Sequence, residues 1–327
     1  MPSISRRPLL LSVGAGLLSK PASAQPSIPD RSIRIMVGFT TGGGSDLVAR
    51  AIAPTIQQRK SRTVTVENRS GSAALTMIEI LRKAPPDGSI IGLLPSTVWL
   101  RRLTTPAVFP VDPLTDLTPL GIIGTFEMAF CVSPETKART IEEYVQWIKE
   151  GPDSRRRFGT AAPETFSQYF AQLIGRQYGV ALEPVPFNGT GPLSSDLAQG
   201  RIPAGCGGLA SFVHQHRGAR LRILVTSGPV RNPVLPDVPT VIDLGLGDLQ
   251  LLEWYAFFAP AALPPRLIAA WNLELINAVE QPDVRAQLTQ YGLNVGVTKP
   301  DECSVRLASD FVRWRKLLDR LGIRNAN

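Results

Sequence analysis

The residues best placed to do chemistry offer backbone amides rather than reactive side chains. Thr40 to Gly44 ends in three consecutive glycines, which let the backbone lie close to a ligand. Ser45 and Asp46 follow, and both residue types are favoured at helix N-termini. A glycine-rich turn that leads into a helix leaves N–H groups unpaired at the positive end of the helix dipole. This pattern is typical of an anion site, although a tight turn without any ligand would use the same glycines.

The spacing of this stretch argues against nucleotides. A P-loop needs Lys and Ser/Thr directly after its last glycine, whereas Ser45 and Asp46 follow Gly44 here. The dinucleotide fingerprint needs a further glycine after Gly44 that this chain lacks. Asp46 would also repel a polyphosphate. A small carboxylate held by backbone amides fits better.

Side chains typical of catalysis or metal binding are sparse. A His-x-His pair can bind a metal from one strand face, but no third ligand lies near His214 and His216, so a surface loop is favoured. No Gly-x-Ser-x-Gly elbow is present. Cys131, Cys206 and Cys303 are too few and too far apart for a disulfide framework or a zinc site, and buried free thiols are favoured over a single disulfide. We therefore expect no enzyme, no metal and no cofactor.

The elements around the glycines predict a strand, a turn and a helix. Ile33 to Phe39 is an apolar, β-branched run that indicates a buried strand. Val48, Ile52 and Ile56 recur every four residues and predict one apolar helix face. Pro54 lies inside this helix and is expected to kink or shorten it.

The rest of the chain alternates strand-like and helix-like segments, which indicates α/β architecture with largely parallel sheets. Proline-marked stretches at 104–119 and 229–239 predict two crossings between lobes. Strands are expected at 63–67, 90–95, 128–132, 182–187, 202–207, 221–226 and 251–259, and a further strand begins at 158. Helices are expected at 72–84, 140–150, 193–199, 265–280, 282–291 and 300–321, and a further helix ends at 178. We therefore expect a signal segment at 1–24, lobe 1 at 25–122 and 248–327, and lobe 2 at 123–247.

The start of the chain is typical of an export signal. Arg6 and Arg7 precede an apolar segment at 8–18 and a small-residue cleavage motif before Gln25. Both the Sec and the twin-arginine routes remain open. The +8 net charge is scattered and has no aromatic-interleaved basic stripe, which argues against nucleic acid as a partner. We expect a periplasmic, monomeric protein.

Several motifs occur in order along the mature chain. They are Pro29 to Phe39, Gly42 to Arg50, Val66 to Gly71, Ala84 to Gly88, Val185 to Gly189, Leu221 to Ser227, Leu235 to Thr240 and Trp254 to Pro260. This ordered set resembles the periplasmic substrate-binding receptors of tripartite tricarboxylate transporters, also called the Bordetella uptake gene (Bug) family. The resemblance implies a two-lobed Venus-flytrap fold (type II) that captures a small carboxylate or related solute and delivers it to a membrane permease.

The resemblance also implies which loops face the ligand, namely those after the first three strands and two loops of the second lobe. The residues expected to bind or to shape the site are Thr40, Thr41, Gly42, Gly43, Ser45, Asp46, Gly71, Ser72, Ala73, Ser96, Thr160, Ala161, Glu164, Thr165, Phe187, Asn188 and Gly189.

Two stretches depart from the family pattern. Residues 159–165 lack two glycines of the usual Gly/Ser-rich loop and introduce Glu164. Glu164 either points outward to cap a helix or pairs with a ligand amine, which would favour an amino acid or a neutral heterocycle over polyanions. Residues 71–75 are bulkier than the family loop, which argues for a small ligand. The alternative functions are a ligand-presenting sensor for a membrane signalling protein and, less favoured, a secreted hydrolase.

Overall fold

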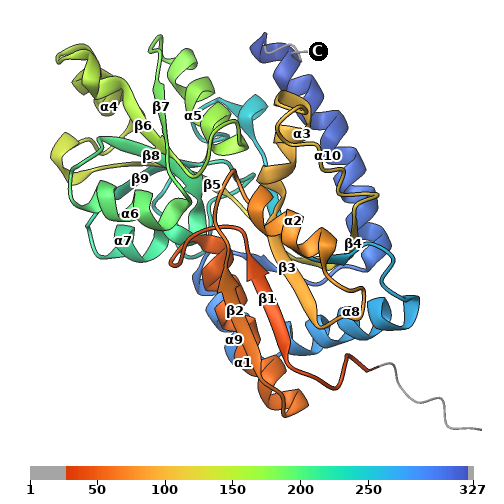
Figure 1. Ribbon diagram of the computed structural model, residues 1–327. Coiled ribbons are helices and arrows are strands. Elements are labelled where there is room, and N and C mark those ends of the chain that lie inside the picture. The colour runs from red at the N-terminus through yellow and green to blue at the C-terminus, as the bar shows by residue number, and fades with distance from the viewer. Residues whose placement is uncertain (1–26, 323–327) are drawn as a thin grey trace, which may run out of the picture.

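Two β-sheets organise the chain, and each forms the centre of one lobe. The computed structural model describes residues 27–322, so the predicted signal segment at 1–24 lies outside the described residues. Segments from both ends of the chain build the first lobe, whereas the green middle of the chain builds the second (Figure 1). Within residues 27–322, no helix is long and apolar enough to cross a membrane.

The first sheet has six strands in the order β11-β4-β10-β3-β1-β2. β1 pairs in parallel with β2 and β3, while β10 runs antiparallel to β3 and β4. Helices from both ends of the chain cover this sheet. The strands are β1 Ile33–Val37, β2 Val64–Asn68, β3 Ile90–Pro95, β4 Leu117–Phe126, β10 Glu253–Pro260 and β11 Asn294–Val295, and the helices are α1 Gly44–Lys60, α2 Leu75–Lys83, α3 Arg101–Thr104, α8 Pro265–Val279, α9 Pro282–Gln290 and α10 Pro300–Leu321.

The second sheet has five strands in the order β7-β6-β8-β5-β9. Its β6 pairs in parallel with β7 and β8, whereas β5 runs antiparallel to β8 and β9. The strands are β5 Met128–Val132, β6 Arg157–Thr160, β7 Glu183–Pro186, β8 Ala204–Gly208 and β9 Arg222–Thr226, and the helices are α4 Ile141–Lys149, α5 Phe166–Gln177, α6 Thr190–Ala198 and α7 Val213–Arg217.

The chain crosses between the sheets beside one buried serine. β4 ends at Phe126 and β5 begins at Met128, so the first crossing takes one residue. The Ser227 hydroxyl accepts from the Met128 N–H at 2.9 Å and donates to the Leu251 carbonyl at 2.7 Å. Ser227 therefore ties the outgoing crossing to the segment that returns to β10.

Two sequence expectations need correction. α1 runs to Lys60 and is not shortened by Pro54. Pro54 is exposed, so the carbonyl that loses its helical donor lies on the solvent side, where water can bond it. The predicted proline-marked linker overlaps β4, a central strand. Its Pro119 lies at a register shift against β10, and such an irregularity accommodates a residue without an N–H.

The predicted free cysteines are confirmed for all three positions. Cys131 in β5 lies opposite Gly205, while Cys206 in β8 lies opposite Phe130. Since paired residues share a sheet face, the two thiols point to opposite faces. They cannot form a disulfide in this fold.

Candidate ligand-binding site

Loops of the two lobes meet at close range between the sheets. The glycine loop, defined here as Thr40 to Gly44, follows β1 and leads into α1. The Thr40 hydroxyl donates to the Asn188 carbonyl of the second lobe at 2.9 Å. A Cβ on Gly191 would lie 2.5 Å from the Thr41 carbonyl oxygen, so only glycine permits this approach. The glycines therefore serve lobe contact as well as local turn geometry.

A small cavity between the lobes, the inner cavity, has a volume of about 40 Å³. Among the residues described, none of those lining it is charged. They come from both lobes: from the loops after β1, β3 and β6, the N-terminal turns of α1, α5 and α6, the ends of β3, β4 and β8, the start of β5, and β10. The lining residues are Phe39, Gly44, Ser45, Pro95, Thr97, Phe126, Met128, Ala161, Ser167, Thr190, Gly207, Gly208 and Tyr255.

The inner cavity is rich in unpaired donors. In the described part of the chain, the N–H groups of Gly44 and Ser45 have no protein acceptor, as expected for the first turn of a helix. The hydroxyls of Ser45, Thr97 and Tyr255, three buried residues that line the cavity, likewise bond no described protein group. Polar groups that a fold leaves unpaired in a closed pocket are costly unless a ligand or water bonds them. The arrangement suits a carboxylate.

Tyr255 is one of the residues that line this cavity. Its ring stacks on Phe126 with centroids 4.3 Å apart and planes at 21°. Burial raises the pKa of the Tyr255 phenol well above its usual value, so the hydroxyl stays protonated and can donate.

A larger outer cavity of about 270 Å³ adjoins the inner one, since Phe39 and Ala161 line both. The loop after β2 bounds it with Ser72 and Ala73 in left-handed conformations, at φ 48° and 54°. Of the residues predicted to bind ligand, Ser45 and Ala161 line the inner cavity. Those that line the outer cavity are Gly71, Ser72, Ala73, Ala161, Phe187 and Asn188.

Asp46 organises the glycine loop but does not reach either cavity. Its carboxylate accepts from the Gly42 N–H, from Asn68 Nδ2 and from Arg50 Nε, each at 2.9 Å. The Gly42 amide is therefore used by the protein itself. Thr41 and Gly42 instead line a separate groove against α6 and α7.

The second lobe's loop after β6, the threonine loop of residues 160–165, satisfies its own polar groups. The Thr160 and Thr165 hydroxyls lie 2.7 Å and 2.9 Å from the Ser167 hydroxyl. Both threonines also donate to the Ala162 carbonyl, at 3.1 Å and 3.0 Å. Thr160 and Thr165 are buried, so their side chains are unavailable to a ligand.

Ser96 and Gly189, which sequence reasoning placed at the ligand, also bond within the protein. The Ser96 hydroxyl donates to the buried Glu253 carboxylate and accepts from the Trp254 N–H at 2.9 Å. Burial raises the pKa of Glu253 to about 7. The Gly189 N–H donates to the Ala161 carbonyl at 2.7 Å. Gly43 lines neither cavity, and its N–H bonds the Thr40 carbonyl at 3.3 Å.

Glu164 does not cap α5. Thr165 is the N-cap residue, and the Glu164 carboxylate lies 3.6 Å from the guanidinium of Arg101 in the first lobe. Burial and then the Glu164 charge raise the pKa of Tyr169 to about 12. The charge of Glu164 thus lies between the lobes.

Comparisons with known proteins show the family of this chain and its fold. The family model described as "Tripartite tricarboxylate transporter family receptor" matches residues 48–323. The chain belongs to this receptor family. It is 30% identical over 281 residues to the "UPF0065 protein in the TAR-I ttuE-ttuC' intergenic region" of Agrobacterium vitis, covering 85% of this chain and 80% of the relative.

Solved receptor structures share the fold. MatC from Rhodopseudomonas palustris with bound malate has a TM-score of 0.82 at 24% identity, covering 89% of this chain and 100% of MatC. The periplasmic binding protein BugD has a TM-score of 0.84 at 22% identity, covering 91% of this chain and 99% of BugD. The predicted family and the two-lobed α/β fold are confirmed. This receptor family is not a class of enzymes.

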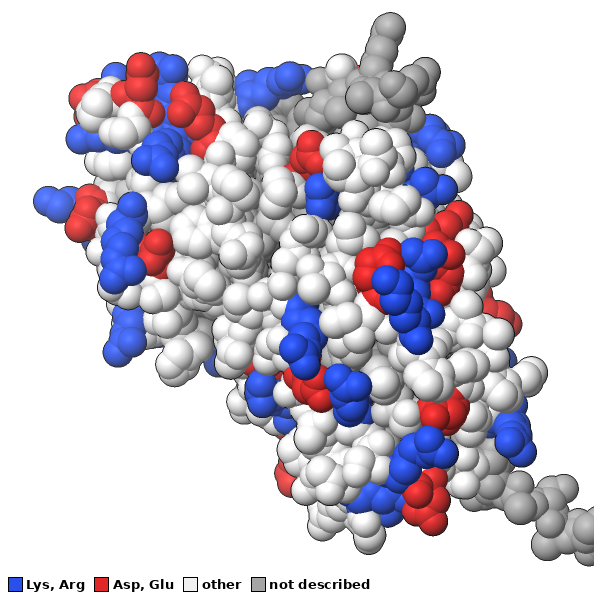
Figure 2. Space-filling model, viewed as in Figure 1, with Lys and Arg blue, Asp and Glu red and all other residues white. Residues whose placement is uncertain are grey.

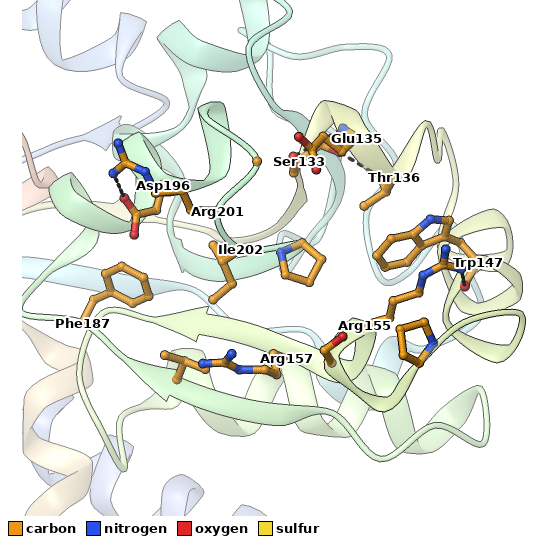
Figure 3. A pocket seen from close by; sticks show the side chains of 15 residues that line it. Ser133, Glu135, Thr136, Trp147, Arg155, Arg157, Phe187, Asp196, Arg201 and Ile202 are labelled. Atoms are coloured by element: carbon orange, nitrogen blue, oxygen red, sulfur yellow. Dashed lines mark hydrogen bonds and ion pairs between the residues drawn. The ribbon is translucent and has the colours of Figure 1, made fainter.

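A further hollow of about 460 Å³, the second-lobe hollow, is lined only by residues of the second lobe (Figure 3). Arg201 pairs there with Asp196 at 2.8 Å, and Arg155 stacks 4.2 Å from the Trp147 ring. Phe187 lies at its edge, and a Cβ on Gly159 would come within 2.9 Å of the Phe187 ring. Phe187 therefore packs close to the β6 strand and lines both this hollow and the outer cavity.

The two histidines form no metal site with their surroundings. They lie on the short helix α7 rather than on a loop or strand. His216 Nδ1 accepts from the Ile223 N–H at 3.1 Å, and burial lowers the pKa of His216. Residues 27–322 contain no group of three or more side chains positioned to hold a metal ion.

Sequence reasoning missed several residues of the inner cavity. Thr97 follows the end of β3 together with Ser96, so this pair was expected to face the cleft or to cap the next helix, but Thr97 was not among the predicted binding residues. Tyr255 lies within the receptor-like stretch from Trp254 to Pro260, but nothing in the stretch shows that its hydroxyl faces a cavity. Phe126 and Met128 flank the first crossing and carried no local signal.

Proposed function

We propose that this receptor captures a small carboxylate in the inner cavity and delivers it to the membrane permease of a tripartite tricarboxylate transporter. The observation that carries the proposal is the set of unpaired neutral donors at Gly44, Ser45, Thr97 and Tyr255. A buried carboxylate that accepts several hydrogen bonds is stabilised in its charged form without a cationic partner. The malate bound to MatC supports this ligand class.

The proposal includes how the protein moves. Lobe 1 comprises 25–122 and 248–327, lobe 2 comprises 123–247, and the pivot lies at the crossings tied by Ser227. Opening would separate Thr40 from Asn188 and admit the ligand, and closure would bury it. The receptor acts in the periplasm as a monomer after export and performs no chemistry on its ligand.

The size of the cavities limits the ligand. The inner cavity, at about 40 Å³, holds little more than a carboxylate group, and the adjoining outer cavity of about 270 Å³ holds the rest of the molecule. An organic acid, an amino acid or a pyridine carboxylate or carboxamide meets these limits.

Thermal stabilisation across a panel of carboxylates, amino acids and pyridine carboxamides tests the proposal. A ligand at 100 times its dissociation constant should stabilise the protein by about 2.7 kcal/mol. Isothermal titration calorimetry then compares Tyr255→Phe with Tyr178→Phe, a matched control whose hydroxyl donates to Glu142 on the second lobe. Only Tyr255→Phe should weaken binding, by about tenfold. Stabilisation by no member of the panel, or equal affinity in both variants, would contradict the proposal.

A further inference from the structure

One ion pair joins the two lobes beside the outer cavity. Arg101 begins α3 in the first lobe, and its side chain is only 9% exposed. Its Nη1 donates to the Ser72 carbonyl at 3.0 Å, and its guanidinium lies 5.7 Å from the centre of the Phe109 ring. Its Nη2 lies 3.6 Å from the carboxylate of Glu164. In the described structure, Arg101 Nε has no hydrogen-bond partner.

Both charges adjoin residues that line the outer cavity. Arg101 bonds the carbonyl of Ser72, and Glu164 directly follows Pro163, and both Ser72 and Pro163 line that cavity. Glu164 has a left-handed backbone with φ 56°. Its N–H donates to Gln168 Oε1 at 3.0 Å, which fixes the residue at the start of α5. The Glu164 side chain, which is 35% exposed, therefore lies next to residues that line the outer cavity.

This carboxylate affects ligands according to their charge at the outer end. A ligand held by one carboxylate in the inner cavity extends toward Ser72 and Pro163. A second ligand carboxylate there would lie near Glu164, whose side chain is 35% exposed, and two like charges at short range repel. Arg101 cannot offset this repulsion fully, because Glu164 already neutralises it.

We propose that Glu164 is a specificity-determining residue that restricts the receptor to ligands with a single carboxylate, whose outer end is neutral or cationic. This inference rests on the proposed function, since it assumes a carboxylate in the inner cavity. The ion pair has one member on each lobe, so an opening motion that separates the two residues would break it. On the face that Figure 2 shows, acidic and basic side chains are interspersed, and no single sign of charge dominates. Discrimination therefore depends on this local pair.

The test uses ligand pairs that differ only in the second carboxylate. Succinate and succinamate, glutarate and glutaramate, and adipate and adipamate are titrated calorimetrically against the full mature protein. The wild type should bind each monoamide at least about tenfold more tightly than its diacid. Glu164→Gln should tighten diacid binding by about tenfold and change monoamide binding by less than about threefold, because it frees Arg101 for the second carboxylate.

Two variants serve as controls. Asp196→Asn makes the same charge change at an ion pair inside the second lobe and should leave both affinities unchanged. The double variant Arg101→Gln, Glu164→Gln should lose the gain in diacid binding, because the two residues act as a pair. Glu164→Ala replaces Glu164→Gln if the latter fails to fold, as judged from its melting temperature.

The outcomes separate the two proposals. If the wild type binds a diacid as tightly as its monoamide, or if Glu164→Gln leaves the ratio unchanged, the specificity inference is wrong and the carboxylate receptor stands. If no member of any pair binds the wild type or the variants, and the wider panel also fails, both proposals are wrong.

Discussion

The two loops that face each other across the cleft use their hydrogen-bonding groups in opposite ways. The glycine loop leads to unpaired N–H groups at Gly44 and Ser45. The threonine loop bonds its hydroxyls to one another and to the Ala162 carbonyl. One loop therefore leaves donors open to a ligand, and the other uses its hydroxyls in bonds within the protein.

The difference follows from residue type. Glycines carry no side chain that can bond a neighbouring amide, so the first-turn donors of α1 stay open. Thr160, Thr165 and Ser167 carry hydroxyls that bond locally, as such residues commonly do near helix starts. Both loops occupy similar places at the ends of parallel strands, yet only one retains binding capacity. Loop position alone does not define a ligand contact.

The largest expected effect comes from filling the space beside the open donors. A Cβ on Gly44 would clash with the Tyr255 hydroxyl and lie 3.6 Å from the Ala210 Cβ. Gly44→Ala should therefore weaken ligand binding by about 100-fold or more, measured by calorimetry. Gly296→Ala is the control, since a Cβ there meets nothing within 4 Å. Binding by Gly44→Ala within about threefold of the wild type would show that the inner cavity is not the site.

In the first lobe, Ser96 also follows a strand end, but its hydroxyl bonds Glu253 and is not open to a ligand. The pKa of Glu253 rises from 4.5 to about 7 through burial, so the folded state keeps a proton that the unfolded state releases. This contribution stabilises the fold below about pH 4.5 and is lost as the pH rises through about 7. Between pH 5 and 8, the free energy of unfolding should fall by about 2 kcal/mol from this group.

Urea denaturation at both pH values measures this fall, and Glu253→Gln should remove it. The substitution keeps an acceptor for Ser96 without a charge. If the variant shows the same pH slope as the wild type, Glu253 is not the titrating group. Ligand affinity should remain unchanged, because Glu253 lines neither cavity.

A substitution at Thr165 tests whether the hydroxyls of the threonine loop support the fold and do not contact the ligand. Thr165→Val removes a buried hydroxyl that bonds Ala162 and Ser167. The free energy of unfolding should fall by about 1 to 2 kcal/mol, while ligand affinity changes by less than about threefold. Denaturation and calorimetry on the same preparation measure both. A large loss of affinity at unchanged stability would assign ligand contacts to this loop and reverse the comparison.

A substitution at Ser45 should show the opposite pattern to Thr165→Val, with a fall in ligand affinity and almost no change in stability. Its hydroxyl bonds no described protein group, so Ser45→Ala should change the free energy of unfolding by less than about 0.5 kcal/mol. Affinity should fall by about tenfold, through loss of one hydrogen bond to a charged ligand group. Thr97→Val should behave alike. Reduced stability with unchanged affinity would place both hydroxyls among structural groups.

The sequence was sufficient for much of the fold because strand and helix periodicities are local. Met128–Val132 was predicted as a strand and forms β5 with the same bounds. β4 was missed because its Pro119 argues against a central strand, and only the register shift against β10 accommodates it. Whether a proline meets such an irregularity depends on the partner strand, which local sequence does not reveal.

The candidate site was predicted less completely. Ser45 and the loop from Gly71 to Ala73 line cavities, because they follow strand ends at the interface between lobes. Ser96 follows a strand end too, but bonds Glu253, which is 157 positions away in the sequence. Glu164 pairs with Arg101, which no sequence pattern linked to it. Local motifs locate loops, whereas the partner that uses each polar group is set by distant packing.

A high-resolution crystal structure of the protein with a bound ligand from the panel would show which groups hold the carboxylate. We predict a ligand carboxylate in the inner cavity, with its oxygens about 2.7 to 3.2 Å from the N–H groups of Gly44 and Ser45 and from the Tyr255 hydroxyl. A carboxylate held instead by an arginine, or bound in the second-lobe hollow with these amides uncontacted, would contradict the account.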